Sequence, residues 1–206
     1  MLEYTIESEV ISNGYANVCG VDEAGRGPLC GPVVAAAVIL PLGLHIDGLN
    51  DSKKLTEKKR ESLYDVIIKE AVSYSICEAS VDEINSTDIL SASLLAMRRA
   101  IEGLQVPADY ALIDGNVTKG FTLPCHAVVH GDAISPSIAA ASVLAKVTRD
   151  RMCVELDSLY PEYGIAKHKG YGTKVHMDAL RKYGPAPIHR TKFIRFLDED
   201  KNVNKA

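Results

Sequence analysis

Two adjacent carboxylates at the end of a short apolar run constrain this chain more than any other feature. Residues 20–31 read Gly-Val-Asp-Glu-Ala-Gly-Arg-Gly-Pro-Leu-Cys-Gly, so Asp22 and Glu23 lead directly into a Gly-Arg-Gly loop. Asp114, within Leu-Ile-Asp-Gly-Asn, and Asp132, within Val-His-Gly-Asp, occupy similar positions. Carboxylate oxygens are the ligands that hard divalent cations prefer. Four acidic residues at strand ends therefore predict a site for such a cation.

The pattern of apolar residues predicts an α/β domain with a mixed central sheet. Strands are expected over residues 19–22, 33–40, 72–79, 110–113 and 123–129. Helices are expected over residues 57–70, from Thr87 to about 102, over 136–159 and near 174–183. Thr56, Thr87 and Ser135 are the predicted N-caps. The first two strands should be antiparallel because their connection is short, and a helical appendage should follow residue 161.

The four carboxylates share one pocket only if their strands are neighbours. Two divalent cations would then neutralise the charge, as in sites that place two ions about 3.5–4 Å apart for phosphoryl displacement. Asp114 has an alternative, because Asp-Gly pairs also mark simple turns. Adjacent strand residues point to opposite faces. Either the strand ends or bulges at Glu23, as the following glycines favour, or Glu23 contributes its backbone carbonyl.

The chain shows no sign of a membrane or secretory destination. No apolar run approaches the roughly 18 residues of a membrane span, and the N-terminus lacks a secretion signal. The five cysteines are scattered, which predicts reduced, buried thiols and a cytoplasmic protein. His126 and His130 could share a strand face, but without a third soft ligand they predict no zinc site.

Charge is distributed unevenly along the chain. The net charge is −4, yet residues 146–195 carry eleven Lys or Arg against five Asp or Glu. A second basic cluster contains Lys53 and Lys54. Such asymmetry is typical of polyanion binding, although solvated helix faces would also produce it.

Three further motifs bear on chemistry. The glycine run from Gly25 is Gly-x-Gly-x-x-x-Gly and precedes a strand, so it matches no nucleotide-binding loop and predicts no nucleotide cofactor. Tyr171, flanked by glycines in a basic loop, either stacks on a base or sugar or folds back on the surface. Ser142 and Lys146, one helical turn apart, form either a Ser–Lys nucleophilic pair or a phosphate contact.

Taken together, these segments closely resemble bacterial ribonuclease HII, the type 2 ribonuclease H. The matching stretches occur in family order and are Gly-Val-Asp-Glu-Ala-Gly-Arg-Gly-Pro (20–28), Leu-Asn-Asp-Ser-Lys-Lys-Leu (49–55), Ile-Asp-Gly-Asn (113–116), Gly-Asp (131–132), Ala-Ala-Ser-Val-Leu-Ala-Lys-Val-Thr-Arg-Asp (140–150) and His-Lys-Gly-Tyr-Gly-Thr (168–173). The resemblance implies one domain over residues 17–206, with residues 1–16 as an N-terminal extension and residues 161–196 as a helical, substrate-contacting part. It also implies a ribonuclease H-like, mixed five-stranded sheet flanked by helices.

The resemblance further implies a metal-dependent endonuclease that hydrolyses the RNA strand of RNA–DNA hybrids. Single ribonucleotides in duplex DNA would be incised on their 5′ side, leaving 3′-hydroxyl and 5′-phosphate ends, during DNA replication and repair. By this match the catalytic ligands of two Mn²⁺ or Mg²⁺ ions are Asp22, Glu23, Asp114 and Asp132.

Substrate contacts follow from the same match. The main chain of Gly25, Arg26 and Gly27 would sense the 2′-hydroxyl at the RNA–DNA junction, and Tyr171 would stack on the next deoxyribose. The remaining backbone contacts would come from Lys53, Lys54, Ser142, Lys146 and Lys169. We expect a monomer whose acidic stretch at residues 198–200 is solvated. The alternatives are a non-catalytic hybrid-binding module, a Ser–Lys hydrolase and a DNA exonuclease of the same fold.

Overall fold

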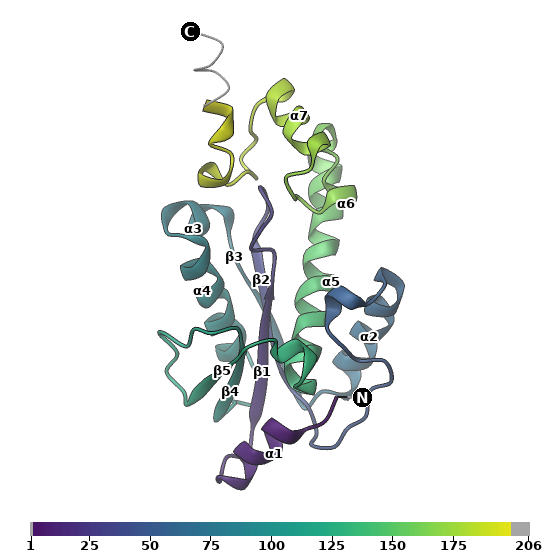
Figure 1. Cartoon of the computed structure of the whole chain (residues 1–206), viewed down its shortest axis with the longest axis vertical. Coiled ribbons are helices and arrows are strands. Elements are labelled where there is room, and N and C mark those ends of the chain that lie inside the picture. The colour runs from purple at the N-terminus through teal and green to yellow at the C-terminus, as the bar shows by residue number, and fades with distance from the viewer. Residues whose placement is uncertain (1, 199–206) are drawn as a thin grey trace.

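The computed structural model describes residues 2–198, which form one sheet with helices on both faces (Figure 1). Within these residues the strands are β1 (Val18–Ala24), β2 (Val33–Ile39), β3 (Ser73–Ala79), β4 (Tyr110–Asp114) and β5 (Cys125–Val128). Their order across the sheet is β3-β2-β1-β4-β5. Strand β2 is antiparallel to β1 and β3, whereas β4 is parallel to β1 and β5. The predicted mixed sheet and its antiparallel first pair are confirmed.

The described helices are α1 (Thr5–Ser12), α2 (Glu57–Glu70), α3 (Val81–Ser86), α4 (Ile89–Glu102), α5 (Pro136–Leu159), α6 (Ile165–His168) and α7 (Lys174–Tyr183). The predicted bounds of α2, α5 and α7 are confirmed, and Thr56 caps α2 by accepting from the Lys59 amide. The predicted cap at Thr87 was wrong. Asp88 caps α4, because its carboxylate accepts from two backbone amides, and Thr87 instead follows the unpredicted helix α3.

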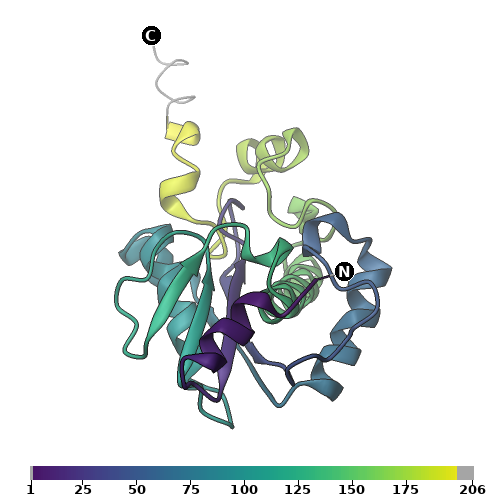
Figure 2. The same cartoon turned by 60° about the horizontal axis from the view of Figure 1, so that its bottom comes forward.

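Helices α4 and α5 cover opposite faces of the sheet. Side chains of β1 alternate between them: Cys19 and Val21 pack in the apolar cluster under α4, and Gly20 faces α5. A Cβ atom on Gly20 would lie 2.1 Å from the carbonyl carbon of Ser137, so only glycine lets α5 approach β1 this closely. Figure 2 shows α5 between the sheet and α2, where apolar side chains of α2, α5 and β2 form one cluster.

The C-terminal part, with α6 and α7, lies beyond one end of the sheet, as the predicted appendage requires (Figure 1). It joins the domain through an apolar cluster that includes Cys30, Tyr163 and Leu180. At the other end of the chain, Glu7 in α1 accepts from the Ser135 hydroxyl at 2.6 Å. Among the described residues, no helix has the length and apolar character needed to cross a membrane. Residues 199 and 200 of the predicted acidic stretch lie outside the described residues.

Candidate active site

Three of the four predicted metal ligands meet at the end of the sheet where β1 and β4 lie side by side. Carboxylate oxygens of Asp22, Asp114 and Asp132 all lie within 4.8 Å of one another. Asp22 projects from β1, Asp114 ends β4, and Asp132 lies in the turn before α5. The Gly131 amide donates to Oδ1 of Asp114 at 2.7 Å, which ties this turn to β4. Asp114 therefore belongs to a carboxylate cluster and is more than a turn residue.

Glu23 occupies a different position from the one predicted. Strand β1 pairs with β2 in unbroken register through Glu23 and Ala24, so the strand neither ends nor bulges at Glu23, and that prediction was wrong. Pairing with β4, however, stops at Val21 and Ile113. Beyond this point the β4 side is open, and Glu23 lines a hollow with Asp114 and the α4 residue Met97. Glu23 thus approaches Asp114 from the α4 face, whereas Asp22 lies on the α5 face.

Burial raises the pKa values of carboxylates in this cluster. Asp22 and Asp132 are 3% and 4% exposed. Burial, with the charges of Glu23 and Asp114, raises the pKa of Asp22 well above its ordinary value. Burial likewise raises the pKa of Asp132, although Lys53 opposes this. Buried oxygen ligands with excess negative charge fit a hard divalent cation such as Mg²⁺ or Mn²⁺.

Lys53 supplies part of the counter-charge. Its Nζ lies 3.3 Å from Oδ2 of Asp132. Partial burial works against the charged ammonium, but Asp132 and Asp22 outweigh it and raise the pKa of Lys53. The predicted residue Lys53 is therefore a charged neighbour of the carboxylates.

A cleft of about 300 Å³ joins the carboxylates to the predicted recognition residues. It is lined by Asp22, Glu23, Ala24, Gly25, Arg26, Gly27, Ser52, Lys53, Asp114, Ser142, Lys146, Arg149 and Tyr171. The Tyr171 ring lies over Gly27, where a Cβ atom would be 3.3 Å from a ring carbon. Tyr171 is 48% exposed, so it is presented to the cleft and does not fold into the core.

The contacts of Ser142 and Lys146 argue against a Ser–Lys nucleophilic pair. The Ser142 hydroxyl lies 2.8 Å from that of Ser52, and Lys146 donates to Oδ1 of Asp150 at 2.6 Å. Ser142 and Lys146 are therefore engaged with other side chains, Ser52 and Asp150.

The two remaining predicted lysines lie away from the cleft. Lys54 pairs with Asp51 at 3.8 Å, and Nζ of Lys169 lies 3.9 Å from Glu57. Neither lysine is among the described residues that line the cleft. Both lysines are therefore outside the set of residues that lines the cleft.

Two buried arginines, which the sequence did not single out, hold the Gly-Arg-Gly loop. Arg190 is fully buried and donates to the carbonyl oxygens of Gly25, Arg26, Pro28, Gly31 and Pro32. Arg149 donates to those of Cys30, Pro32 and Lys169. Both arginines belong to the basic excess of residues 146–195, yet neither is a surface charge. No local pattern distinguishes such an arginine from an exposed one.

Gly25 is required for this arrangement. Its φ is +100°, and a Cβ atom there would lie 2.0 Å from Nε of Arg149. The loop, Tyr171 and the two arginines therefore form one packed unit beside the carboxylates.

A mixed sheet that ends in clustered carboxylates beside a partly basic cleft defines a metal-dependent phosphodiester hydrolase of the ribonuclease H-like class. A family profile described as Ribonuclease HII matches residues 19–196. Ribonuclease HII of Desulfitobacterium hafniense (strain DSM 10664 / DCB-2) is 54% identical over 187 residues, covering 91% of this chain and 72% of its own length. Ribonuclease HII of Burkholderia lata is 57% identical over 176 residues, covering 85% and 82%. The chain belongs to the ribonuclease HII family.

Solved structures agree with this assignment. The ribonuclease H2 from Pyrococcus horikoshii OT3 is similar with a TM-score of 0.75 and 27% identity, covering 91% of this chain and 99% of that one. Bst-RNase HIII in complex with Mn²⁺ shares the fold with a TM-score of 0.66 and 17% identity, covering 88% and 64%. The predicted fold and family are confirmed, and the chain is an endoribonuclease whose family degrades the RNA of RNA–DNA hybrids.

The raised carboxyl pKa values predict how the metal-free protein responds to pH. At these carboxyls the folded chain keeps protons that the unfolded chain releases above about pH 4, so their contribution to the free energy of unfolding falls as the pH rises further. Burial lowers the pKa of His176 and lowers that of His189 to about 4, so these two histidines act in the opposite sense until the pH passes their ordinary value of about 6.5. Asp22→Asn removes one buried charge and should raise that free energy near neutral pH by about 1–3 kcal/mol. Urea unfolding in chelator, across the pH range, measures both effects. A stability advantage of Asp22→Asn over the native chain that fails to grow with pH would contradict this electrostatic account, and saturating Mn²⁺ should remove that advantage.

Replacing Arg190 tests the clamp on the loop. Arg190→Lys keeps the charge but cannot reach several carbonyl oxygens at once, so we expect a loss of about 3–5 kcal/mol in the free energy of unfolding. Hydrogen exchange should quicken in residues 25–32 before it does in β3. The exposed Arg195 provides the control, Arg195→Lys. Equal stability and equal exchange in the two variants would rule out the clamp.

Proposed function

We propose that this ribonuclease incises duplex DNA on the 5′ side of single embedded ribonucleotides, as well as cutting the RNA strand of hybrids. The products would carry 3′-hydroxyl and 5′-phosphate ends. One observation carries the proposal: a single cleft is lined by the Gly-Arg-Gly loop, by Tyr171 and by the carboxylates of Asp22, Glu23 and Asp114. A cutting site and a surface suited to one sugar are therefore next to each other.

The carboxylates would perform the cut. Asp22, Asp114 and Asp132 would hold two Mg²⁺ or Mn²⁺ ions, with Glu23 approaching from the α4 face. Bound cations of this kind activate a water and stabilise the leaving oxygen of a phosphoryl displacement. Lys53, at 3.3 Å from Asp132, would hold the neighbouring phosphate and limit the repulsion between substrate and carboxylates.

The loop and Tyr171 would choose where the cut falls. Arg190 already occupies the carbonyl oxygens of Gly25 and Arg26, so the loop N–H groups would contact the 2′-hydroxyl, with no side chain at Gly27 to obstruct it. Tyr171 would stack on the following deoxyribose, where a 2′-hydroxyl would crowd the ring. The site therefore favours a junction of one ribose followed by one deoxyribose.

The remaining predicted contacts would bind phosphates along the duplex. Ser142 and Lys146 line the cleft, whereas Lys54 and Lys169 would contact phosphates further along the duplex. Action as a monomer stays a prediction. Ribonucleotide removal during DNA replication and repair is the corresponding role, and the cytoplasmic location stays a prediction.

Asp22→Asn separates cutting from binding. The variant should lose cleavage of an RNA–DNA hybrid by about 10³-fold or more, because a neutral amide is a poor ligand for a hard cation. Hybrid binding, measured by fluorescence anisotropy in Ca²⁺ or without metal, should stay within about threefold because phosphate contacts remain. Ser142→Ala tests the alternative nucleophile; because it would remove only a phosphate contact, it should lower activity far less than Asp22→Asn. Near-normal turnover by Asp22→Asn would refute the site.

Tyr171→Ala tests the choice of substrate. Loss of the ring should lower cleavage at a single ribonucleotide by about tenfold or more, the usual cost of one stacking contact, and affect long hybrids much less. Tyr74, exposed on the edge strand β3, supplies the control Tyr74→Ala. Equal losses on both substrates would remove the proposed sensing role of Tyr171.

A further inference from the structure

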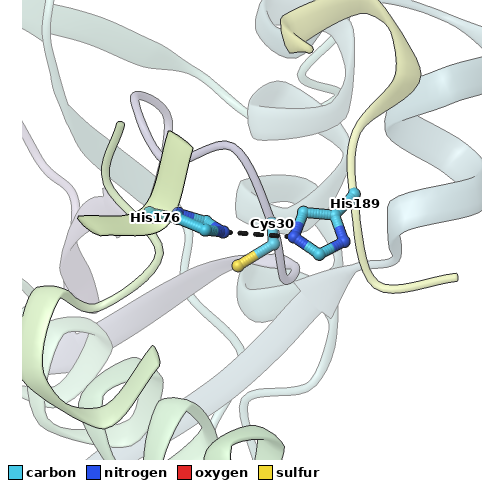
Figure 3. Close-up of side chains that lie close together, drawn as sticks. All are labelled: Cys30, His176 and His189. Carbon is cyan, nitrogen blue, oxygen red and sulfur yellow. Dashed lines mark hydrogen bonds between the residues drawn. The ribbon is translucent and has the colours of Figure 1, made fainter. Parts of the chain in front are cut away.

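A second group of potential metal ligands lies apart from the carboxylates, in the interior of the C-terminal part. Figure 3 shows Cys30, His176 and His189 converging on one point. Their ligand atoms lie within 4.8 Å of one another, and all three residues are buried. The two Nε2 atoms are 3.1 Å apart. The residues come from three separate segments, so sequence spacing alone concealed the group.

Backbone contacts at Nδ1 orient both imidazole rings so that the two Nε2 atoms face each other. Nδ1 of His176 donates to the carbonyl oxygen of Tyr171 at 3.0 Å, which leaves its Nε2 lone pair directed at the group. Nδ1 of His189 lies 3.0 Å from the Ala186 amide and 3.2 Å from the Ala186 carbonyl oxygen. His189 therefore has a backbone partner in either tautomer. Fixing the outer nitrogen in this way is the usual arrangement of metal-binding histidines.

The spacing of the two Nε2 atoms fits a tetrahedral ion. Two nitrogens at about 2.0–2.1 Å from zinc in tetrahedral geometry are about 3.3 Å apart. The observed separation of 3.1 Å requires a shift of only a few tenths of an ångström. One thiolate with two imidazoles is a borderline-soft ligand set, which selects Zn²⁺ over Mg²⁺ or Mn²⁺.

We propose that Cys30, His176 and His189 bind one Zn²⁺ ion, at a site separate from the carboxylates that suit hard cations. On binding, the Cys30 thiol loses its proton to solvent. The Nε2 proton of His189 is lost and Nδ1 gains one, which donates to the Ala186 carbonyl oxygen. Three protein ligands leave one position of the ion for water, so we expect an affinity of about micromolar, weaker than closed four-ligand sites.

The ion would join the segments that carry the recognition residues. Cys30 follows the Gly-Arg-Gly loop, His176 bonds the Tyr171 carbonyl, and His189 precedes Arg190. Zinc at this point would stabilise the arrangement of loop and ring beside the cleft. The metal site itself stands independently of the proposed function, and only an effect on ribonucleotide selectivity would rest on it.

Cobalt substitution tests the site directly. Co²⁺ is titrated into the metal-free, full-length protein under reducing conditions, with excess Mg²⁺ to occupy the carboxylates. We expect one equivalent to produce a thiolate-to-cobalt charge-transfer band and intense visible bands, which Zn²⁺ then abolishes. Cys30→Ala should remove the charge-transfer band, whereas Cys125→Ser and Asp22→Asn should keep it. Absence of the band, its survival in Cys30→Ala or its loss in Asp22→Asn would overturn the proposal.

Thermal unfolding provides the second measurement. Zn²⁺ at about 100 times its dissociation constant should raise the Tm of the native chain by about 5–10 °C. The same addition should raise the Tm of His126→Gln equally and that of Cys30→Ala much less. Cys30→Ala removes only one sulfur atom, so it should fold even where His189→Gln does not. An equal zinc shift in the native chain and Cys30→Ala would also overturn the proposal.

Discussion

The buried guanidinium groups of Arg149 and Arg190 are the interaction on which the recognition face depends. A charge removed from water costs several kcal/mol unless hydrogen bonds compensate it. Here the compensation comes from carbonyl oxygens of the loop after β1 and of the loop that carries Tyr171. The loop carbonyl oxygens accept the hydrogen bonds that the buried guanidinium groups donate. Neither the buried arginines nor the loops would be stable without the other. This reciprocity fixes two loops that are far apart in the sequence.

The sheet supplies the other half of the site. Parallel pairing of β1 with β4 brings Asp22 beside Asp114, and the turn before α5 adds Asp132. Because the pairing of β1 with β4 ends at Val21, two residues before Glu23, the β4 side of Glu23 is open. Asp22 and Glu23 point to opposite faces of β1 and so approach Asp114 from opposite sides. The arrangement of the acidic cluster therefore depends on where the strand pairing ends as well as on the order of the strands. Its raised carboxyl pKa values follow from burial, which a bound cation would offset.

Much of this could be predicted from the sequence, because the information is local. Apolar periodicity identified the five strands and the bounds of α2, α5 and α7, and acidic residues after apolar runs identified the cluster. Most of what the sequence did not reveal concerns contacts between distant segments. The position of Glu23 depends on where β4 ends, and the arginine clamp depends on burial that a count of basic residues does not reveal. Cys30, His176 and His189 meet only through tertiary packing. The wrong cap at Thr87 is a local error. Thr87 and Asp88 are both residue types that cap helices, and the Asp88 carboxylate accepts hydrogen bonds from two backbone amides.

The central claim is that the carboxylates cut while the clamped loop and Tyr171 choose the position. Cleavage mapping on a duplex with one ribonucleotide, labelled at either end, tests it most directly, with Mg²⁺, with Mn²⁺ and with chelator. The account predicts a single cut on the 5′ side of the ribonucleotide with a divalent cation, and none in chelator. Cleavage that ignores the ribonucleotide, or that persists in chelator, would contradict it.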